Sequence, residues 1–192
     1  DGSNRKAPQI ITLDTPVQAR YIRIIGKGHF NPWNVNSARM SYSEIKVFEV
    51  FQEIEANLLE GKQATSNVAI DYSMAASDGS IDETLGWGPS SDKSVYTTIN
   101  AGVETGGSDN GYEQWPGAYL QYDFGEEKAV KQVEVYRFWY NTSLDTVTFK
   151  DCIIQLSTDS NFDPTMTTTI FGGKTGQDVI MRSDIAPDGS NR

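Results

Sequence analysis

Hydrophobic residues along most of this chain recur at every second position. In YLQYDFG, Leu120, Tyr122 and Phe124 share one face of an extended segment. VKQVEVYRF alternates in the same way, with Val133 and Val135 on one face and polar residues on the other. A period of two is typical of strands that have one face in a hydrophobic core.

Further short runs have the same β-rich composition: IITLD, RYIRII, EIKVFEV, CIIQLS and TTTIF. Clusters of Gly, Asn, Asp, Ser and Pro separate these runs and favour turns. Only FQEIEANLLEGK has a helical composition, and because it lacks a sustained amphipathic stripe we interpret it as a connector with at most one or two turns. The pattern predicts an all-β protein built as an antiparallel β-sandwich.

The segment from Gly86 to Gly117 is long for a connection within a compact domain. It contains two Trp and two Tyr residues, whereas disordered segments are poor in aromatic residues. We therefore predict an ordered loop here.

Residues 57 to about 175 carry a series of motifs whose order is informative. They are NLLEGKQATSN, AASDGSIDETLGW, WPGAYLQYDFG, VKQVEVYRFWYNTS and FKDCIIQLSTDSNFDPTMTTTIF. This order resembles a discoidin, or coagulation factor 5/8 type C, domain, a family that includes many bacterial carbohydrate-binding modules. The resemblance implies a galactose-binding-like, jelly-roll sandwich.

Two motifs that close such a domain, ARYIRI and SEIKVFE, stand here at the start of the chain. The chain thus resembles one family domain, residues 1–192, in permuted order. Residues 1–50 would be its C-terminal family segment, 51–56 a junction, and 57–192 its N-terminal and central segment.

The pentapeptide DGSNR occurs at residues 1–5 and again at residues 188–192. Two explanations of this order remain open, tandem repetition of near-identical units and circular permutation. Permutation is tolerated when the termini lie close together, as they do in an antiparallel sandwich of this family. Residues 1–50 would either fold back onto the rest of the chain or complete the sandwich of a neighbouring copy.

Charge and composition exclude some classes of binding partner. The chain has 16 basic and 26 acidic residues, a net charge of -10, and no basic cluster that would follow a phosphate backbone. No segment has the roughly 20 consecutive apolar residues of a membrane-spanning helix. We therefore expect neither nucleic acid binding nor membrane insertion. The single cysteine, Cys152, alternates with Ile154 and Leu156, which predicts a core thiol.

The loop AASDGSIDET gathers carboxylates, hydroxyls and backbone carbonyls, the oxygen ligands that Ca²⁺ prefers. Solvated loops are often acidic, so the residues alone leave metal binding open. The family resemblance implies a structural Ca²⁺ between this loop and a Glu on the last family strand. The implied ligands are Asp78, Glu44, Thr84, Ser80 and Ala75, with Asp82 and Glu83 as rivals to Thr84.

Two stretches combine aromatic rings, which pack on the apolar faces of sugars, with polar groups that bind hydroxyls. RFWYNTS supplies Arg137, Trp139 and Tyr140, and GKGHFNPWNVNSAR supplies His29, Phe30, Trp33, Asn34 and Asn36. The resemblance implies that both stretches form loops at the ligand-binding end of the sandwich. Packing of these aromatics over the end of the sandwich is the alternative.

No catalytic motif stands out, because the chain has one His, one Cys and no Ser-centred elbow or phosphate-binding Gly loop. The sequence favours a non-catalytic carbohydrate-binding module of an extracellular or cell-surface bacterial protein, with a glycan as partner. The alternative is a structural repeat of a surface adhesin or filament, in which neighbouring copies of the repeat exchange strands.

Overall fold

The computed structural model describes residues 8–26, 29–30, 39–50, 56–79, 97–100, 118–137, 148–149 and 152–172. These residues form β-strands and two short 3-10 turns, with no α-helix among them. The strands are β1 (Gln9–Gly26), β2 (His29–Phe30), β3 (Arg39–Glu49), β4 (Thr65–Ser66), β5 (Ile70–Asp71), β6 (Thr97–Asn100), β7 (Ala118–Arg137), β8 (Thr148–Phe149), β9 (Ile153–Ser157) and β10 (Thr167–Phe171). The turns are η2 (Ala75–Ser77) and η5 (Pro164–Met166).

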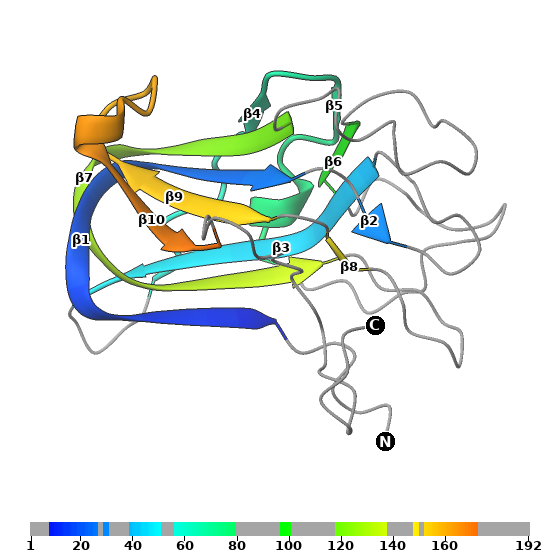
Figure 1. Cartoon of the computed structure of the whole chain (residues 1–192). Coiled ribbons are helices and arrows are strands. Elements are labelled where there is room, and N and C mark those ends of the chain that lie inside the picture. Colours follow the sequence, from blue (N-terminus) through cyan, green and yellow to red (C-terminus); the bar gives the residue numbers. More distant parts are fainter. Residues whose placement is uncertain are drawn as a thin grey trace, which may run out of the picture.

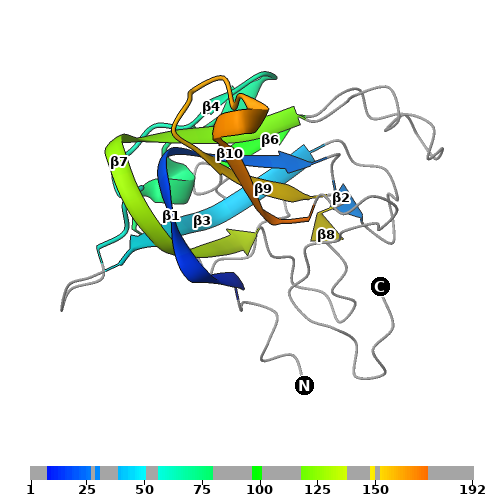
Figure 2. The ribbon, with the colours of Figure 1, turned by 60° about the vertical axis from the view of Figure 1, so that its left-hand side comes forward.

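β1 and β7 are long strands that each run through both layers of a sandwich. They pair antiparallel, from Gly26 opposite Ala118 to Gln9 opposite Val135, and their register shifts twice on the way. Figure 1 shows both strands turning back together at one end of the molecule. This bent pair folds a single eight-stranded antiparallel sheet into two facing layers, which the turned view of Figure 2 also shows.

The strand order is β10-β9-β1-β7-β3-β6-β5, with β4 also on β7. One layer contains β10, β9, the second half of β1, the first half of β7 and β4. The other contains the first half of β1, the second half of β7, β3, β6 and β5. The strands from residues 1–50 thus lie inside the sheet, since β1 pairs with β9 and β7, and β3 with β7 and β6, of the same chain.

The core lies between the two layers and confirms the predicted alternation. Leu120, Val133 and Val135 are fully buried, while the residues between the two valines and on either side of them are not. Cys152 is also fully buried, together with Ile154, as predicted for a core thiol. The all-β antiparallel sandwich predicted from the pattern is confirmed.

Two predicted boundaries are wrong. YLQYDFG and VKQVEVYRF belong to one strand, β7, and IITLD and RYIRII belong to one strand, β1. β7 bends without leaving the sheet because Gly125 has a φ of 96°, which residues with a Cβ rarely adopt. The predicted loop between Gly86 and Gly117 contains β6, whereas its other residues lie outside the described residues.

Candidate functional site

A β-bulge in β3 determines where Glu44 points. β3 advances by two residues, from Tyr42 to Glu44, where β7 advances by one, so Ser43 is an extra residue. An extra residue reverses the alternation of a strand beyond it. Tyr42 faces the core before the bulge and Ile45 faces it afterwards. Glu44 therefore lies on the outer face of its layer, where η2 packs against β3 and the carboxylate is 0% exposed.

Asn57 joins the start of the second segment to β3. Its Oδ1 accepts hydrogen bonds from the amides of Val47 (3.0 Å) and Leu59 (3.1 Å). Its Nδ2 donates to Glu44 Oε1 (3.2 Å) and to the Ile45 carbonyl (3.3 Å). The side chain thus uses all four of its hydrogen-bonding positions to hold residues 57–59 against β3.

The second carboxylate oxygen of Glu44 has no hydrogen-bond partner although it is buried. The pKa of Glu44 is raised to about 7, chiefly by burial and then by the nearby Asp78 and Glu60 carboxylates, while Lys46 and the Gly79 amide oppose the rise. A buried oxygen without a partner is costly, and a nearby carboxylate makes it more so. A proton or a cation would relieve both costs.

The segment that covers Glu44 is held together by its own hydrogen bonds. The Ser77 hydroxyl donates to the Lys62 carbonyl (2.5 Å), and the Gly61 amide donates to the Ser77 carbonyl (2.7 Å). The Ala64 amide donates to the Ser73 carbonyl (2.8 Å). These contacts hold η2 against residues 61–64, and η2 also packs on β3, the strand of Glu44.

Of the expected metal ligands, Glu44, Asp78 and Ala75 lie in the described part of the chain. Asp78 is close enough to Glu44 to raise its pKa, and Ala75 lies in η2, which packs on β3. Thr84, Ser80 and Asp82 lie outside the described residues. No group of three His, Cys, Asp or Glu side chains in the described ranges could hold a metal ion. Glu44 and Asp78 supply two carboxylates, and with added carbonyl oxygens such a set would suit Ca²⁺ better than a softer metal.

The residues expected to bind a ligand lie only partly in the described chain. Arg137 ends β7 and lies opposite Tyr42 near the start of β3. His29 and Phe30 form β2, which pairs with β8. Trp33, Asn34, Asn36, Trp139 and Tyr140 lie outside the described residues. Gly26 at the end of β1, the start of β3 and the end of β7 all lie at the end of the sandwich opposite the bend (Figure 1).

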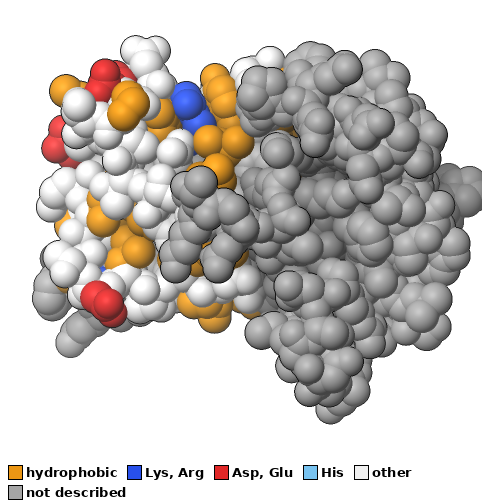
Figure 3. Space-filling view, in the orientation of Figure 1, with side chains coloured by type: hydrophobic (Ala, Val, Ile, Leu, Met, Phe, Trp, Pro, Cys, Tyr) orange, Lys and Arg blue, Asp and Glu red, His pale blue; other side chains and the backbone are white. Residues whose placement is uncertain are grey.

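Sequence reasoning missed the most exposed aromatic side chain of the described residues. Tyr72 is 53% exposed and Met74 is 49% exposed, and both lie directly before η2. The other exposed large hydrophobic residues of the described chain are Ile10 and Met166. An aromatic residue between turn formers in IDYSMAAS was the available signal. The face shown in Figure 3 has its hydrophobic side chains in small groups among polar and backbone atoms.

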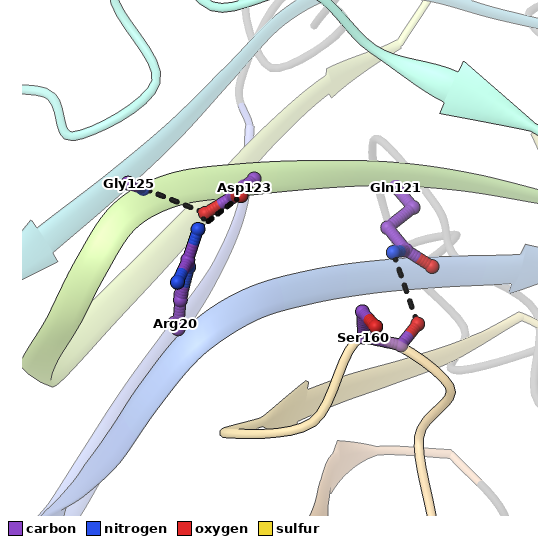
Figure 4. A network of polar contacts seen from close by, with 5 residues as sticks. All are labelled: Arg20, Gln121, Asp123, Gly125 and Ser160. Atoms are coloured by element: carbon purple, nitrogen blue, oxygen red, sulfur yellow. Dashed lines mark hydrogen bonds and ion pairs between the residues drawn. The ribbon is translucent and has the colours of Figure 1, made fainter.

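An exposed ion pair stands at the bend of β7. Arg20 contacts Asp123 through two hydrogen bonds, Nε to Oδ1 (2.9 Å) and Nη2 to Oδ2 (3.0 Å). The Gly125 amide also donates to Asp123 Oδ1 (2.7 Å), as Figure 4 shows. Arg20 and the Gly125 amide lower the pKa of Asp123. The Asp123-Phe124-Gly125 sequence therefore fixes the bend of the strand.

Beside this pair, the loop between β9 and β10 is held on the outer face of the sheet. The Arg23 guanidinium lies 4.0 Å from the centres of both the Tyr119 and the Phe162 rings. Gln121 Nε2 donates to the Ser160 carbonyl (3.2 Å; Figure 4). Arg23 also donates two hydrogen bonds to Gln121 Oε1 (3.0 and 2.7 Å), so the polar groups of the cluster are paired within it and we interpret it as structural.

No helix in the described part of the chain is long and apolar enough to cross a membrane. Comparison with models of known protein families, with curated proteins and with solved structures finds no match to this chain.

Proposed function

We propose that this chain is a non-catalytic carbohydrate-binding module of the discoidin-like type, from an extracellular bacterial protein, with a structural calcium ion. Its partner would be a glycan or cell-surface polysaccharide. The module itself would neither bind nucleic acid nor insert into a membrane.

One observation carries the proposal. The end of β7, at Arg137, is hydrogen-bonded in register with the start of β3. The two stretches rich in aromatic and polar residues, 26–39 and 137–143, therefore depart from neighbouring positions at one end of the sandwich. Residues far apart in the sequence could then converge on one sugar, as a site built from several loops requires.

The buried carboxylate supports the calcium part of the proposal. Glu44 Oε2 would bind the ion together with Asp78 and carbonyl oxygens of the turn that begins at Ala75. The ion would supply positive charge that neutralises two neighbouring carboxylates. Since Glu44 comes from residues 1–50 and Asp78 from the second segment, binding would join the two segments and stabilise the folded state.

A glycan array with the wild-type protein and Trp139→Ala tests the proposal. We expect binding by the wild type and a loss of about tenfold or more in the variant, because a stacking aromatic is removed. Absence of any binding by the wild type would exclude the carbohydrate-binding function.

The repeated DGSNR sequence favours a second candidate, a structural repeat of an adhesin or filament. In this case neighbouring copies would bind one another, and the protein would bind no glycan on the array. Sedimentation of the full chain over a range of concentrations would then show self-association. Strand exchange between copies would compete with the pairing of β1 and β3 to β7 within one chain.

A further inference from the structure

Hydrogen bonds hold the backbone at Tyr72 in place, while its aromatic ring is exposed. Tyr72 has a φ of 51°, a left-handed conformation that is unfavourable for a bulky residue. The conformation persists because the Tyr72 carbonyl accepts hydrogen bonds from Thr97 Oγ1 (2.7 Å) and from the Ala75 amide (3.0 Å). Thr97 is fully buried and its hydroxyl also accepts from the Ala76 amide (2.9 Å).

The two residues that follow Tyr72 are held as firmly. The Ser73 carbonyl accepts from the Ala64 amide, and the Met74 carbonyl accepts from the Ser77 amide. Three consecutive carbonyls are thus fixed while the Tyr72 and Met74 side chains stay exposed. Strained backbone that the surrounding structure enforces is concentrated at functional sites. A ring fixed in this way loses little conformational entropy when a ligand stacks on it.

Strand register relates this ring to the proposed ligand-binding end. Arg137 of β7 lies opposite Tyr42 of β3, and Tyr42 lies opposite Thr97 of β6. Thr97 in turn holds the Tyr72 carbonyl. Two strand spacings of about 4.8 Å therefore separate Arg137 from the residue that anchors Tyr72. Tyr72 is at the level of the sandwich where the aromatic-rich stretch after Arg137 begins.

The size of the exposed patch indicates its occupant. Within the described residues, two large apolar side chains are exposed here, and the exposed Asp71 and Asp78 lie on either side of them in the sequence. A stable protein interface buries about 800 Å² on each partner, which this patch does not approach. One sugar ring fits it, because its apolar face packs on an aromatic ring and its hydroxyls donate to a neighbouring carboxylate such as Asp71.

We propose that Tyr72, flanked by Met74, is a stacking subsite for a second sugar ring of an oligosaccharide whose first ring binds at the end of β7. This inference rests on the proposed glycan-binding function and specifies the ligand as a chain of sugars. It assigns binding to a residue outside both aromatic-rich stretches.

Titration calorimetry tests it with the best oligosaccharide from the glycan array and with the terminal monosaccharide of that oligosaccharide. Tyr72→Ala should lower affinity for the oligosaccharide about tenfold and leave affinity for the monosaccharide unchanged. Tyr72→Phe should bind as the wild type does, because the ring is kept. Met166→Ala, at an equally exposed residue on η5, is the matched control and should change neither affinity.

Tyr72→Asn separates binding from folding. Asn adopts positive φ more readily than Tyr, so this variant should melt at the same temperature as the wild type or higher, and still lose affinity for the oligosaccharide. Equal affinity of the wild type, Tyr72→Ala and Tyr72→Asn for the oligosaccharide would overturn the subsite and leave the proposed function standing. A wild type that binds no sugar would remove both. Dimerisation that Tyr72→Ala abolishes would assign the patch to self-association instead.

Discussion

Glu44 and Asp123 are two carboxylates at contacts between residues 1–50 and the rest of the chain, and their surroundings are opposite. Asp123 has a side chain that is 45% exposed and faces its own cation, Arg20. Glu44 is 0% exposed, and one of its oxygens has no hydrogen-bond partner. The pKa of Asp123 is lowered, chiefly by the hydrogen bond from Arg20, whereas burial raises that of Glu44 to about 7.

The two carboxylates differ in how well their charge is satisfied by hydrogen bonds and a nearby cation. Asp123 has hydrogen-bond partners for both carboxylate oxygens, and solvent screens its attraction to Arg20. The pair therefore contributes mainly to the local geometry of the bend. The carboxylate of Glu44 is out of water, and only one of its two oxygens accepts a side-chain hydrogen bond, so its charged form costs stability until a cation or a proton binds. Removal of single groups should therefore have larger effects around Glu44 than around Asp123.

Asn57→Ala should give the largest effect. It leaves Glu44 Oε1 and the Val47 and Leu59 amides without their partner. Unsatisfied buried groups cost about 1 to 3 kcal/mol each, and with partial access of water we expect a loss of about 2 to 4 kcal/mol in the free energy of unfolding. Urea denaturation measures it. Gln63→Ala, at an exposed residue of the same segment, is the control, and an equal loss in both variants would contradict this account.

The charge of Glu44 should make metal-free protein less stable as pH rises. Its folded pKa of about 7 exceeds its ordinary value of 4.5, so the folded state binds this proton more tightly than the unfolded chain does. The corresponding stability is fully present below about pH 4.5 and is lost as pH rises through about 7. After a discount for solvent screening, the loss is about 2 kcal/mol. Thermal unfolding in a chelator from pH 5 to pH 8 measures it.

Glu44→Gln isolates this contribution from all other titrating groups. In the chelator, the variant should be more stable than the wild type at pH 8, and the difference should shrink toward pH 5. Added Ca²⁺ should raise the melting temperature of the wild type at pH 8 and leave that of the variant unchanged. A wild type that does not respond to Ca²⁺ would refute the metal site and leave the pH dependence as a separate result.

The sequence was sufficient to predict a two-layered antiparallel β-sandwich. The alternation around Leu120 and Val133 is a local property, because a half-buried strand needs one apolar face, and the structure agrees with it. The joining of two runs into β7 was not predictable from the pattern, since a bend at Gly125 resembles a turn. The pairing of β1 with both β9 and β7 depends on contacts over more than a hundred residues, which periodicity does not encode.

The candidate site was predictable only in part. Glu44 and Asp78 were named together through a family resemblance alone, and their role as metal ligands stays a prediction. Asn57 was not found, because a polar residue at the start of a segment gives no sign of the carboxylate that it will contact. Tyr72 was missed as well, since its exposure results from a left-handed backbone that Thr97 enforces from another strand.

Gly125→Ala should have a smaller effect than the changes around Glu44. An added Cβ meets only Lys62 Nζ, at 3.6 Å, so the cost comes from the φ of 96° alone. A residue with a Cβ at positive φ costs about 1 to 2 kcal/mol. Urea denaturation should show this loss with an unchanged m-value. A larger loss would mean that the bend, more than the buried site, holds the two layers together.

Arg20→Gln should have the smallest effect on stability. It tests directly whether the pKa values of Asp123 and Glu44 are set independently. The melting temperature at neutral pH should change by less than about 3 °C, and by less still at high salt, because the pair is exposed. Carbon-detected NMR titration should show the pKa of Asp123 rising toward its ordinary 3.8, yet staying below it because the Gly125 amide still donates to the carboxylate. The pKa of Glu44 should not move, since its causes are burial and the neighbours Asp78, Glu60, Lys46 and Gly79. A shift at both carboxylates would show that the two contacts are coupled through β1 and β7, and the separation drawn between them would fail.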